Sequence, residues 1–165
     1  KRSTQLLEAA VQRDRPLAAY ARLILANTGS VEDAEYLAAL LGSYDDAVRR
    51  SAAYALRFAP NLDDATRARL RETAKREPVA SPARIHLLIA WLAHADMAEW
   101  PEIKRLLRPY AQSDVQTERY QYGEAMAIRG EAAEVPALLQ LLDDEDADVR
   151  VSAANALLAL ERRQR

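Results

Sequence analysis

The sequence predicts an all-α fold of repeated helix pairs, and its composition gives the first reason. Of the 165 residues, 50% are hydrophobic and 29% are charged, with four Gly and no Cys, which excludes disordered, collagen-like and disulfide-stapled classes. Residues that favour helices, such as Ala, Leu, Glu and Arg, are abundant, whereas the β-branched and aromatic residues typical of sheets are sparse. The second reason is an internal repeat whose apolar residues recur with a helical period.

The clearest repeat places residues 40–56 over residues 141–157 without a gap, with ten identities in seventeen positions. The offset of 101 is about three units of 34 residues, so further copies are expected between the two. Arginines at nearly regular spacing mark these copies: Arg15, Arg49, Arg84, Arg119 and Arg150. Each is followed six residues later by an alanine: Ala21, Ala55, Ala90, Ala125 and Ala156. We therefore predict a single repeat domain over residues 1–165, with copies at approximately 3–29, 30–60, 61–95, 96–130 and 131–162.

Each copy is expected to contribute two helices, of which the second begins near the repeated arginine. At 100° per residue, positions −1, +3, +6, +7 and +10 from that arginine fall on one face, which is largely apolar and expected to be buried. The small alanine at +6 allows neighbouring helices to approach closely. The first helices correspond, in chain order, to the amphipathic stretches 6–11, 36–41, 65–74, 103–107 and 135–142.

Capping residues, glycines and prolines fall where these helices are expected to begin and end. Ser30 with Asp33 resembles a capping box, and Ser81 with Pro82 is expected to begin a second helix. Carboxylates or hydroxyls also precede other second helices, at Asp45, Asp46, Ser113, Asp114 and residues 144–146. Three glycines fit helix C-termini and two prolines fit junctions between copies: Gly29, Gly42, Gly130, Pro60 and Pro101. The turns at 75–82 and 110–114 are longer than the turn in the ungapped match, so we expect irregular geometry there.

The string Asp-x-x-Val-Arg-x-x-Ala-Ala-x-Ala-Leu occurs at residues 45–56 and again at 146–157. With a period near 34 to 35, it resembles HEAT repeats, and in particular the short bacterial HEAT-like modules similar to those named from phycobilisome lyases. The resemblance implies a right-handed α-α superhelix of about five helical hairpins, whose second helices line a concave surface that binds other macromolecules. The tetratricopeptide repeat has the same period, but its pattern of Trp, Leu-Gly, Tyr and a late Pro fits no copy.

The column of arginines has two interpretations. In the structural one, each arginine pairs with an aspartate of its own or the adjacent turn, as the resemblance implies, and Asp45 and Asp146 are suitably placed. In the other, five cations grip phosphates, which would require further Lys or Arg on the concave positions, where they are nearly absent. We favour the structural interpretation.

No arrangement of residues in the sequence predicts a catalytic site, a metal site or a cofactor. His86 and His94 are eight residues apart and do not form the i, i+4 pair typical of zinc sites. No His precedes Glu, unlike the iron-binding deoxyhypusine-hydroxylase-like HEAT proteins. The acidic residues 143–148 fit a helix N-terminus better than a cation site, and no Gly-rich phosphate loop or serine nucleophile motif is found. We therefore predict that the protein is not an enzyme.

The outward positions of the second helices, +1, +5 and +9 from each arginine, are mostly aromatic and aliphatic instead of charged. We expect them to bind a partner, because aromatic and arginine residues dominate binding hot spots. The residues expected to make this contact are Tyr20, Arg50, Tyr54, Phe58, Ile85, Ile89, Tyr120 and Glu124. The alternative is that neighbouring second helices, or a flanking domain, bury part of this stripe.

These observations predict a non-catalytic scaffold or adaptor that binds a protein or peptide partner, or another domain of its own chain. The alternative is a HEAT-like DNA-binding or DNA glycosylase-type protein, against which the net charge of −2 and the pI near 5.8 argue. A role with a bilin chromophore has only the resemblance to support it. No window approaches the roughly 20 apolar residues of a membrane span. Because the chain starts at Lys1 and not at Met, we expect a piece of a longer protein, and the compartment is left open.

Overall fold

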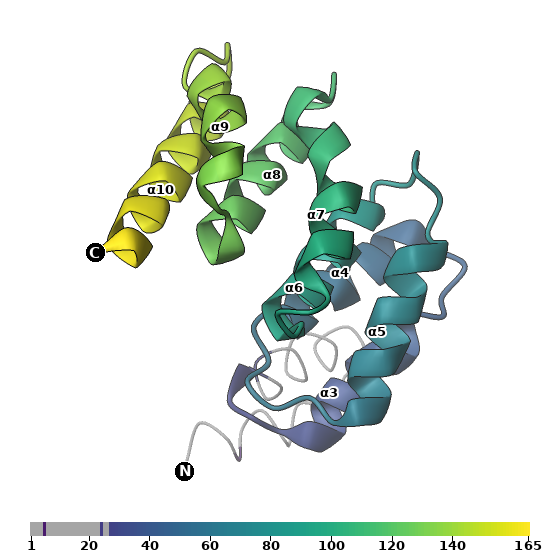
Figure 1. Ribbon diagram of the computed structural model, residues 1–165. Helices are drawn as coiled ribbons and strands as arrows, with labels where there is room; N and C mark the ends of the chain where they lie inside the picture. Colours follow the sequence, from purple (N-terminus) through teal and green to yellow (C-terminus); the bar gives the residue numbers. More distant parts are fainter. Residues whose placement is uncertain (1–4, 6–23, 25–26) are drawn as a thin grey trace. The chain divides into compact units, whose positions relative to one another are not determined.

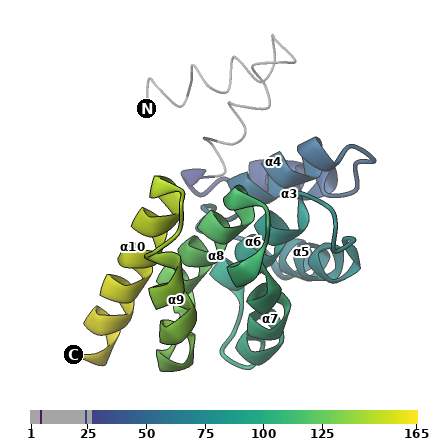
Figure 2. The same cartoon turned by 90° about the horizontal axis from the view of Figure 1, so that it is seen from above.

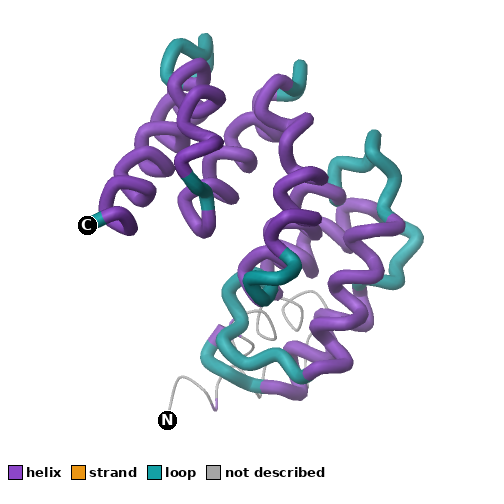
Figure 3. The backbone as a smooth tube through the Cα atoms, in the orientation of Figure 1, coloured by secondary structure: helices purple, strands orange, loops and turns teal. Residues whose placement is uncertain are grey.

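The structure is a computed structural model that describes residues 5, 24 and 27–165. Among these residues every regular element is helical and none is a strand, as Figure 3 shows. The helices form consecutive pairs, which confirms the predicted all-α fold of helical hairpins. Nearly all of the first expected copy, residues 3–29, lies outside the described residues. The chain divides into two compact units between His94 and Ala95.

Unit 1 (Lys1–His94) contains two helical hairpins among its described residues. The first hairpin is α3 (Val31–Leu40) with α4 (Asp46–Leu56), and the second is α5 (Asp64–Arg76) with α6 (Arg84–His94). α3 packs against α4 and α5 against α6 (Figure 1). The two hairpins are stacked in register, because α4 also packs against α6 and α3 against α5.

Side-chain caps fix the starts of three of these helices. The Ser30 hydroxyl accepts a hydrogen bond from the Asp33 amide at 3.3 Å, which is the predicted cap of α3. Asp45 caps α4 through the Ala47 amide at 2.9 Å, and Asp63 caps α5 through the Thr66 amide at 2.7 Å.

The backbone has a distinctive geometry just before the first residues of α3 and α6. Gly29 precedes α3 with a φ of 102°, a conformation that residues with a side chain rarely adopt. The expected start of α6 at Ser81 and Pro82 is too early, because α6 begins at Arg84. The Arg84 amide bonds to the Ser81 carbonyl at 3.1 Å, three residues back, so a tighter turn precedes the α-helix.

The core of unit 1 contains the predicted apolar face. Ala55 and Ala90, two members of the alanine column, are buried. α6 differs from a half-buried helix, because its buried residues point in every direction: Ile85, Leu87, Leu88, Ile89, Ala90, Trp91 and Leu92. A helix that is apolar all round needs neighbours on several sides, and α6 packs on both α4 and α5.

Unit 2 (Ala95–Arg165) also contains two hairpins, but short 3₁₀ helices interrupt them. Its elements are α7 (Trp100–Leu107), η1 (Arg108–Gln112), α8 (Gln116–Arg129), η2 (Ala132–Glu134), α9 (Val135–Leu141) and α10 (Ala147–Gln164). η1 lies in the turn for which irregular geometry is predicted. α8 and α10 lie side by side in Figure 2 and share the main interface of the unit.

That interface depends on small residues. Ala125 of α8 and Ala156 of α10, both from the alanine column, are fully buried. Gly123 of α8 faces Ser152 of α10 so closely that a Cβ atom at Gly123 would lie 2.3 Å from the Ser152 hydroxyl. Small residues therefore set the distance between the second helices, as the sequence predicts for four of the five alanines; Ala21 lies outside the described residues.

Candidate protein-binding surface

The repeated arginines within the described residues make structural contacts in their own or the following hairpin. Arg49 of α4 donates from Nη1 to the carbonyl of Ser43, six residues back, at 2.8 Å. It also reaches Glu77, in the turn between α5 and α6, with Nη2 2.6 Å from Oε1 and Nε 3.0 Å from Oε2. The two side chains expose 15% and 5% of their surface. Hydrogen bonding to Glu77 raises the pKa of Arg49.

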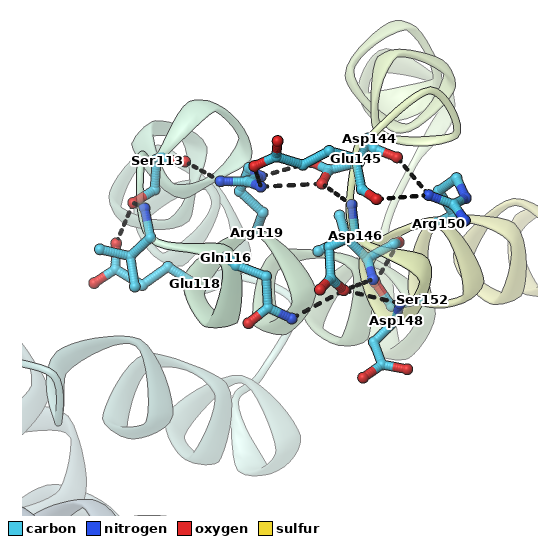
Figure 4. A network of polar contacts seen from close by, with 12 residues as sticks. Ser113, Gln116, Glu118, Arg119, Asp144, Glu145, Asp146, Asp148, Arg150 and Ser152 are labelled. Atoms are coloured by element: carbon cyan, nitrogen blue, oxygen red, sulfur yellow. Dashed lines mark hydrogen bonds and ion pairs between the residues drawn. The ribbon is translucent and has the colours of Figure 1, made fainter.

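Arg119 of α8 repeats this arrangement in unit 2 (Figure 4). It donates to the carbonyl of Ser113, again six residues back, at 2.8 Å. Nε and Nη2 bind the two carboxylate oxygens of Asp144 at 2.6 and 3.0 Å. This contact, mainly through its hydrogen bonds, lowers the pKa of Asp144. An arginine fork that holds both oxygens is the strongest geometry for such a pair.

The structural interpretation is correct for Arg119, which pairs with an aspartate of a neighbouring turn as expected, whereas Arg49 pairs with a glutamate. Neither arginine pairs with Asp45 or Asp146, the aspartates that the sequence suggested. Asp45 and Asp146 cap α4 and α10 instead, and Asp146 accepts from the amides of Asp148 and Val149. The acid that pairs with each arginine comes from the turn of the following hairpin.

The other arginines of the column make backbone contacts. Arg84 donates to the carbonyl of Glu77, and Arg150 donates to the carbonyls of Asp144 and Glu145 at 2.7 and 3.0 Å (Figure 4). Arg15 lies outside the described residues.

At α4 and the turn that follows it, the predicted outward residues form an exposed surface. We call it the α4 surface and define it as Arg50, Tyr54 and Phe58. Arg50 and Tyr54 lie four residues apart on one face of α4. Phe58 follows in the turn just after the helix, which ends at Leu56. All three are exposed, and the two aromatic residues expose 47% and 48% of their surface. Their rings meet edge to face with centroids 5.3 Å apart. Edge-to-face contact of this kind is a favourable arrangement of two aromatic rings.

Two residues outside the predicted set support the α4 surface. Arg57 places its guanidinium 5.1 Å from the centroid of the Phe58 ring. His86 of α6 lies beneath the surface, with its ring centroid 6.5 Å from that of Tyr54. Burial, together with the positive charges of Arg50 and Arg57, lowers the pKa of His86 to about 4. The imidazole is therefore neutral at neutral pH, and the arginines supply the positive charge.

Sequence reasoning missed both supporting residues for identifiable reasons. Arg57 directly precedes Phe58 in the chain, and that adjacency was an available signal. His86 lies opposite Tyr54 only because α4 packs on α6, and no spacing within one helix predicts that contact.

The structure does not expose every residue of the predicted stripe. Ile85 and Ile89 are 2% and 1% exposed, so the expectation that they face outward is wrong. The cause is the position of α6, which packs on both α4 and α5. Tyr120 and Glu124 belong to α8 in unit 2 and are half-buried, and Tyr20 lies outside the described residues. Arg50, Tyr54 and Phe58 are thus the predicted residues that the structure brings together.

Among the described residues, no group of three or more His, Asp or Glu side chains is arranged to hold a metal ion. In the same part of the chain, no helix is both long enough and apolar enough to cross a membrane.

The described residues form helical hairpins that stack in register, an architecture consistent with a HEAT-like solenoid. In agreement, residues 135–162, which include α9 and nearly all of α10, match the family model described as HEAT repeat. No curated protein matches the chain. HEAT repeats are generally protein-interaction scaffolds and are typically not catalytic.

Proposed function

We propose that this protein is a non-catalytic scaffold that binds a protein or peptide partner, or another domain of its own chain, through the α4 surface. The observation that carries the proposal is the exposed, edge-to-face pair of Tyr54 and Phe58 beside the exposed Arg50. The string at residues 146–157, within the HEAT match, further suggests the short bacterial type of module, similar to those named from phycobilisome lyases.

The energetics of such a surface favour binding. Tyr, Trp and Arg dominate the binding free energy of protein interfaces, because they bury a large area and also form polar contacts. The Tyr54 ring already contacts the rings of both Phe58 and His86. An ordered side chain loses less conformational entropy on binding than a mobile one, so more of its contact energy becomes affinity.

The charge of the surface suggests the kind of partner. Arg50 is exposed, and Arg57 lies over Phe58, while His86 is neutral because of its lowered pKa. A partner with an apolar side chain for the two rings and a carboxylate for Arg50 would match the surface in shape and sign.

The test begins with a partner isolated from a display library of protein fragments encoded by the source genome. Its affinity is then measured by calorimetry for wild-type protein and for Tyr54→Ala and Phe58→Ala. We expect each variant to weaken binding about tenfold or more, which corresponds to about 1.4 kcal/mol or more.

Tyr44→Ala is the matched control, because Tyr44 is fully exposed in the turn between α3 and α4, outside the α4 surface. Circular dichroism must show that all variants stay folded. Unchanged affinity in both Tyr54→Ala and Phe58→Ala would refute the α4 surface as the binding site.

A further inference from the structure

A groove of about 950 Å³ opens in unit 2 on the side formed by the first helices of its hairpins. We call it the α7/α9 groove. One wall comes from α7 and η1, the other from η2 and α9, and α8 forms the floor with Tyr122 and Met126. The volume lies at the upper end of the range that ligand sites occupy, roughly 300 to 1,000 Å³.

The walls and the floor of this groove are largely apolar and rigid. Pro101, Pro109 and Pro136 line the walls, together with the alanines of η2 and α9. Proline has a fixed φ and no amide hydrogen, so these wall positions are stiff and present no backbone donor. Tyr122 and Met126 are buried at the floor. An apolar side chain that entered the groove would therefore meet apolar surface on both walls.

Tyr122 adds a polar group to the floor. Burial, reinforced by the nearby charge of Glu134, raises the pKa of Tyr122 to about 12. The phenol therefore stays protonated at any physiological pH and keeps its hydrogen-bond donor.

Positive charges outnumber negative charges around the groove. Lys104 is neutralised, because its ammonium lies 2.8 Å from Glu131 and 3.5 Å from Glu134. Arg105 and Arg108 also line the groove and are exposed. Neither of their side chains forms a hydrogen bond or ion pair with a residue in the described part of the chain. Glu134 also lines the groove, so Lys104, Arg105 and Arg108 against Glu131 and Glu134 leave a net charge of +1, with two arginines that form no ion pair in the described part of the chain.

We propose that the α7/α9 groove binds an acidic peptide segment of a partner protein, with apolar side chains against the wall prolines Pro101, Pro109 and Pro136 and a carboxylate at Arg105 and Arg108. Carboxylates are the natural ligands of arginine, since the guanidinium can hold both oxygens at once. The inference rests on the proposed role in protein binding, but it uses a second surface with its own residues. This way of binding a peptide combines two known forms of peptide recognition, in which apolar side chains anchor the peptide and arginines bind its acidic groups.

The experiment uses random 12-residue peptides displayed on phage and selected against the whole chain. We expect the enriched peptides to carry Asp or Glu next to Leu, Ile or Phe. An enriched peptide is then synthesised with a fluorescent label and titrated by anisotropy. Arg105→Glu with Arg108→Glu should weaken its binding at least tenfold. The same peptide with Lys in place of its acidic residues should bind this double variant better than it binds wild-type protein.

Two further variants separate the groove from general effects of charge and folding. Arg69→Glu with Arg162→Glu makes the same change in net charge at exposed arginines outside the groove, and should leave affinity within twofold of wild type. Ala133→Trp places a large side chain at an exposed position of the groove wall, and should block binding while the far-ultraviolet circular dichroism spectrum stays unchanged.

Three results would overturn the inference: no enrichment above an unrelated control protein, enriched peptides without acidic residues, or full affinity in the Arg105→Glu and Arg108→Glu variant. The outcome is distinguishable from the test of the α4 surface. Tyr54→Ala with Phe58→Ala should leave binding of the selected peptide unchanged, whether or not it abolishes binding of the partner fragment.

Discussion

Arg49 and Glu77 lie 28 residues apart in the chain and form a forked ion pair that joins one helical hairpin to the next, with Nη2 2.6 Å from Oε1. Arg119 and Asp144 form the same contact 25 residues apart in unit 2. In both cases the arginine also binds the carbonyl six residues before it. One side chain thus fixes the turn of its own hairpin and the position of the following one.

Replacing Arg49 with alanine should lower the free energy of unfolding of unit 1. Arg49→Ala leaves the Glu77 carboxylate, which is 5% exposed, without its countercharge. Loss of one partner from a buried pair costs about 3 kcal/mol or more, and we expect a loss near this lower limit in the free energy of unfolding measured with urea. Arg76→Ala is the control, because Arg76 and Glu72 expose 82% and 52% and are separated by 3.4 Å. An exposed pair of this kind contributes about 0.5 kcal/mol or less. Equal losses in the two variants would contradict the prediction.

The sequence predicted the helices and the buried alanines because both follow from periodicity along one helix. Ala55, Ala90, Ala125 and Ala156 are all buried as expected. The acidic partners of the arginines could not be predicted in this way, because the turns differ in length and place Glu77 and Asp144 at different distances from their arginines.

The candidate binding surface likewise shows that periodicity along one helix predicts only part of the structure. The four-residue spacing of Tyr54 and Phe58 was enough to predict that they lie together, since four residues make about one helical turn and Phe58 follows directly after the end of α4. Whether a face is exposed depends on which other helices cover it. Ile85 and Ile89 have the same spacing as Tyr54 and Phe58, yet they are buried, because α6 packs against two other helices. The α7/α9 groove is likewise built from five elements, and no local sequence pattern relates them.

Gly123→Ala should destabilise the interface between α8 and α10. The added Cβ atom would lie 2.3 Å from the Ser152 hydroxyl and 3.0 Å from backbone of the same residue, so the helices must separate. Overpacking of this kind costs about 1 to 3 kcal/mol, and the better helix propensity of Ala returns at most about 1 kcal/mol. Thermal unfolding followed by circular dichroism should therefore show a lower Tm. Gly42→Ala is the matched control, because its Cβ would meet the nearest atom at an acceptable 3.4 Å. A Tm for Gly123→Ala at or above that of wild type would refute the close contact.

Arg163 should stabilise the end of α8. Its guanidinium donates to four carbonyls near that end, those of Met126, Ala127, Ile128 and Gly130, at 2.8 to 3.3 Å. A cation at a helix C-terminus is favoured by the helix dipole and satisfies carbonyls that lack helical partners. We expect Arg163→Ala to cost about 1 to 2 kcal/mol and to accelerate amide hydrogen exchange in the last turn of α8. Arg162→Ala, at an adjacent exposed position, should change neither quantity, and identical exchange in the two variants would count against the cap.

His86 should make the folded state sensitive to mild acid. Its pKa is about 4 in the folded protein, chiefly because of burial, against about 6.5 in an unfolded chain. The unfolded state therefore takes up the proton first as the pH falls. The stability contributed by neutral His86 is complete above pH 6.5 and is progressively lost between pH 6.5 and pH 4.

From pH 6.5 to pH 5, above the range in which unfolded carboxylates titrate, this loss amounts to about 2 kcal/mol. Urea unfolding at a series of pH values should show that His86→Gln flattens this part of the profile. The flattening should be incomplete, because the pKa of His94 is also lowered, mainly by burial. The direct measurement is an NMR titration of the His86 ring. A pKa near 6.5 would show that the imidazole is hydrated, and the ordered support that it gives to Tyr54 would then have to be abandoned.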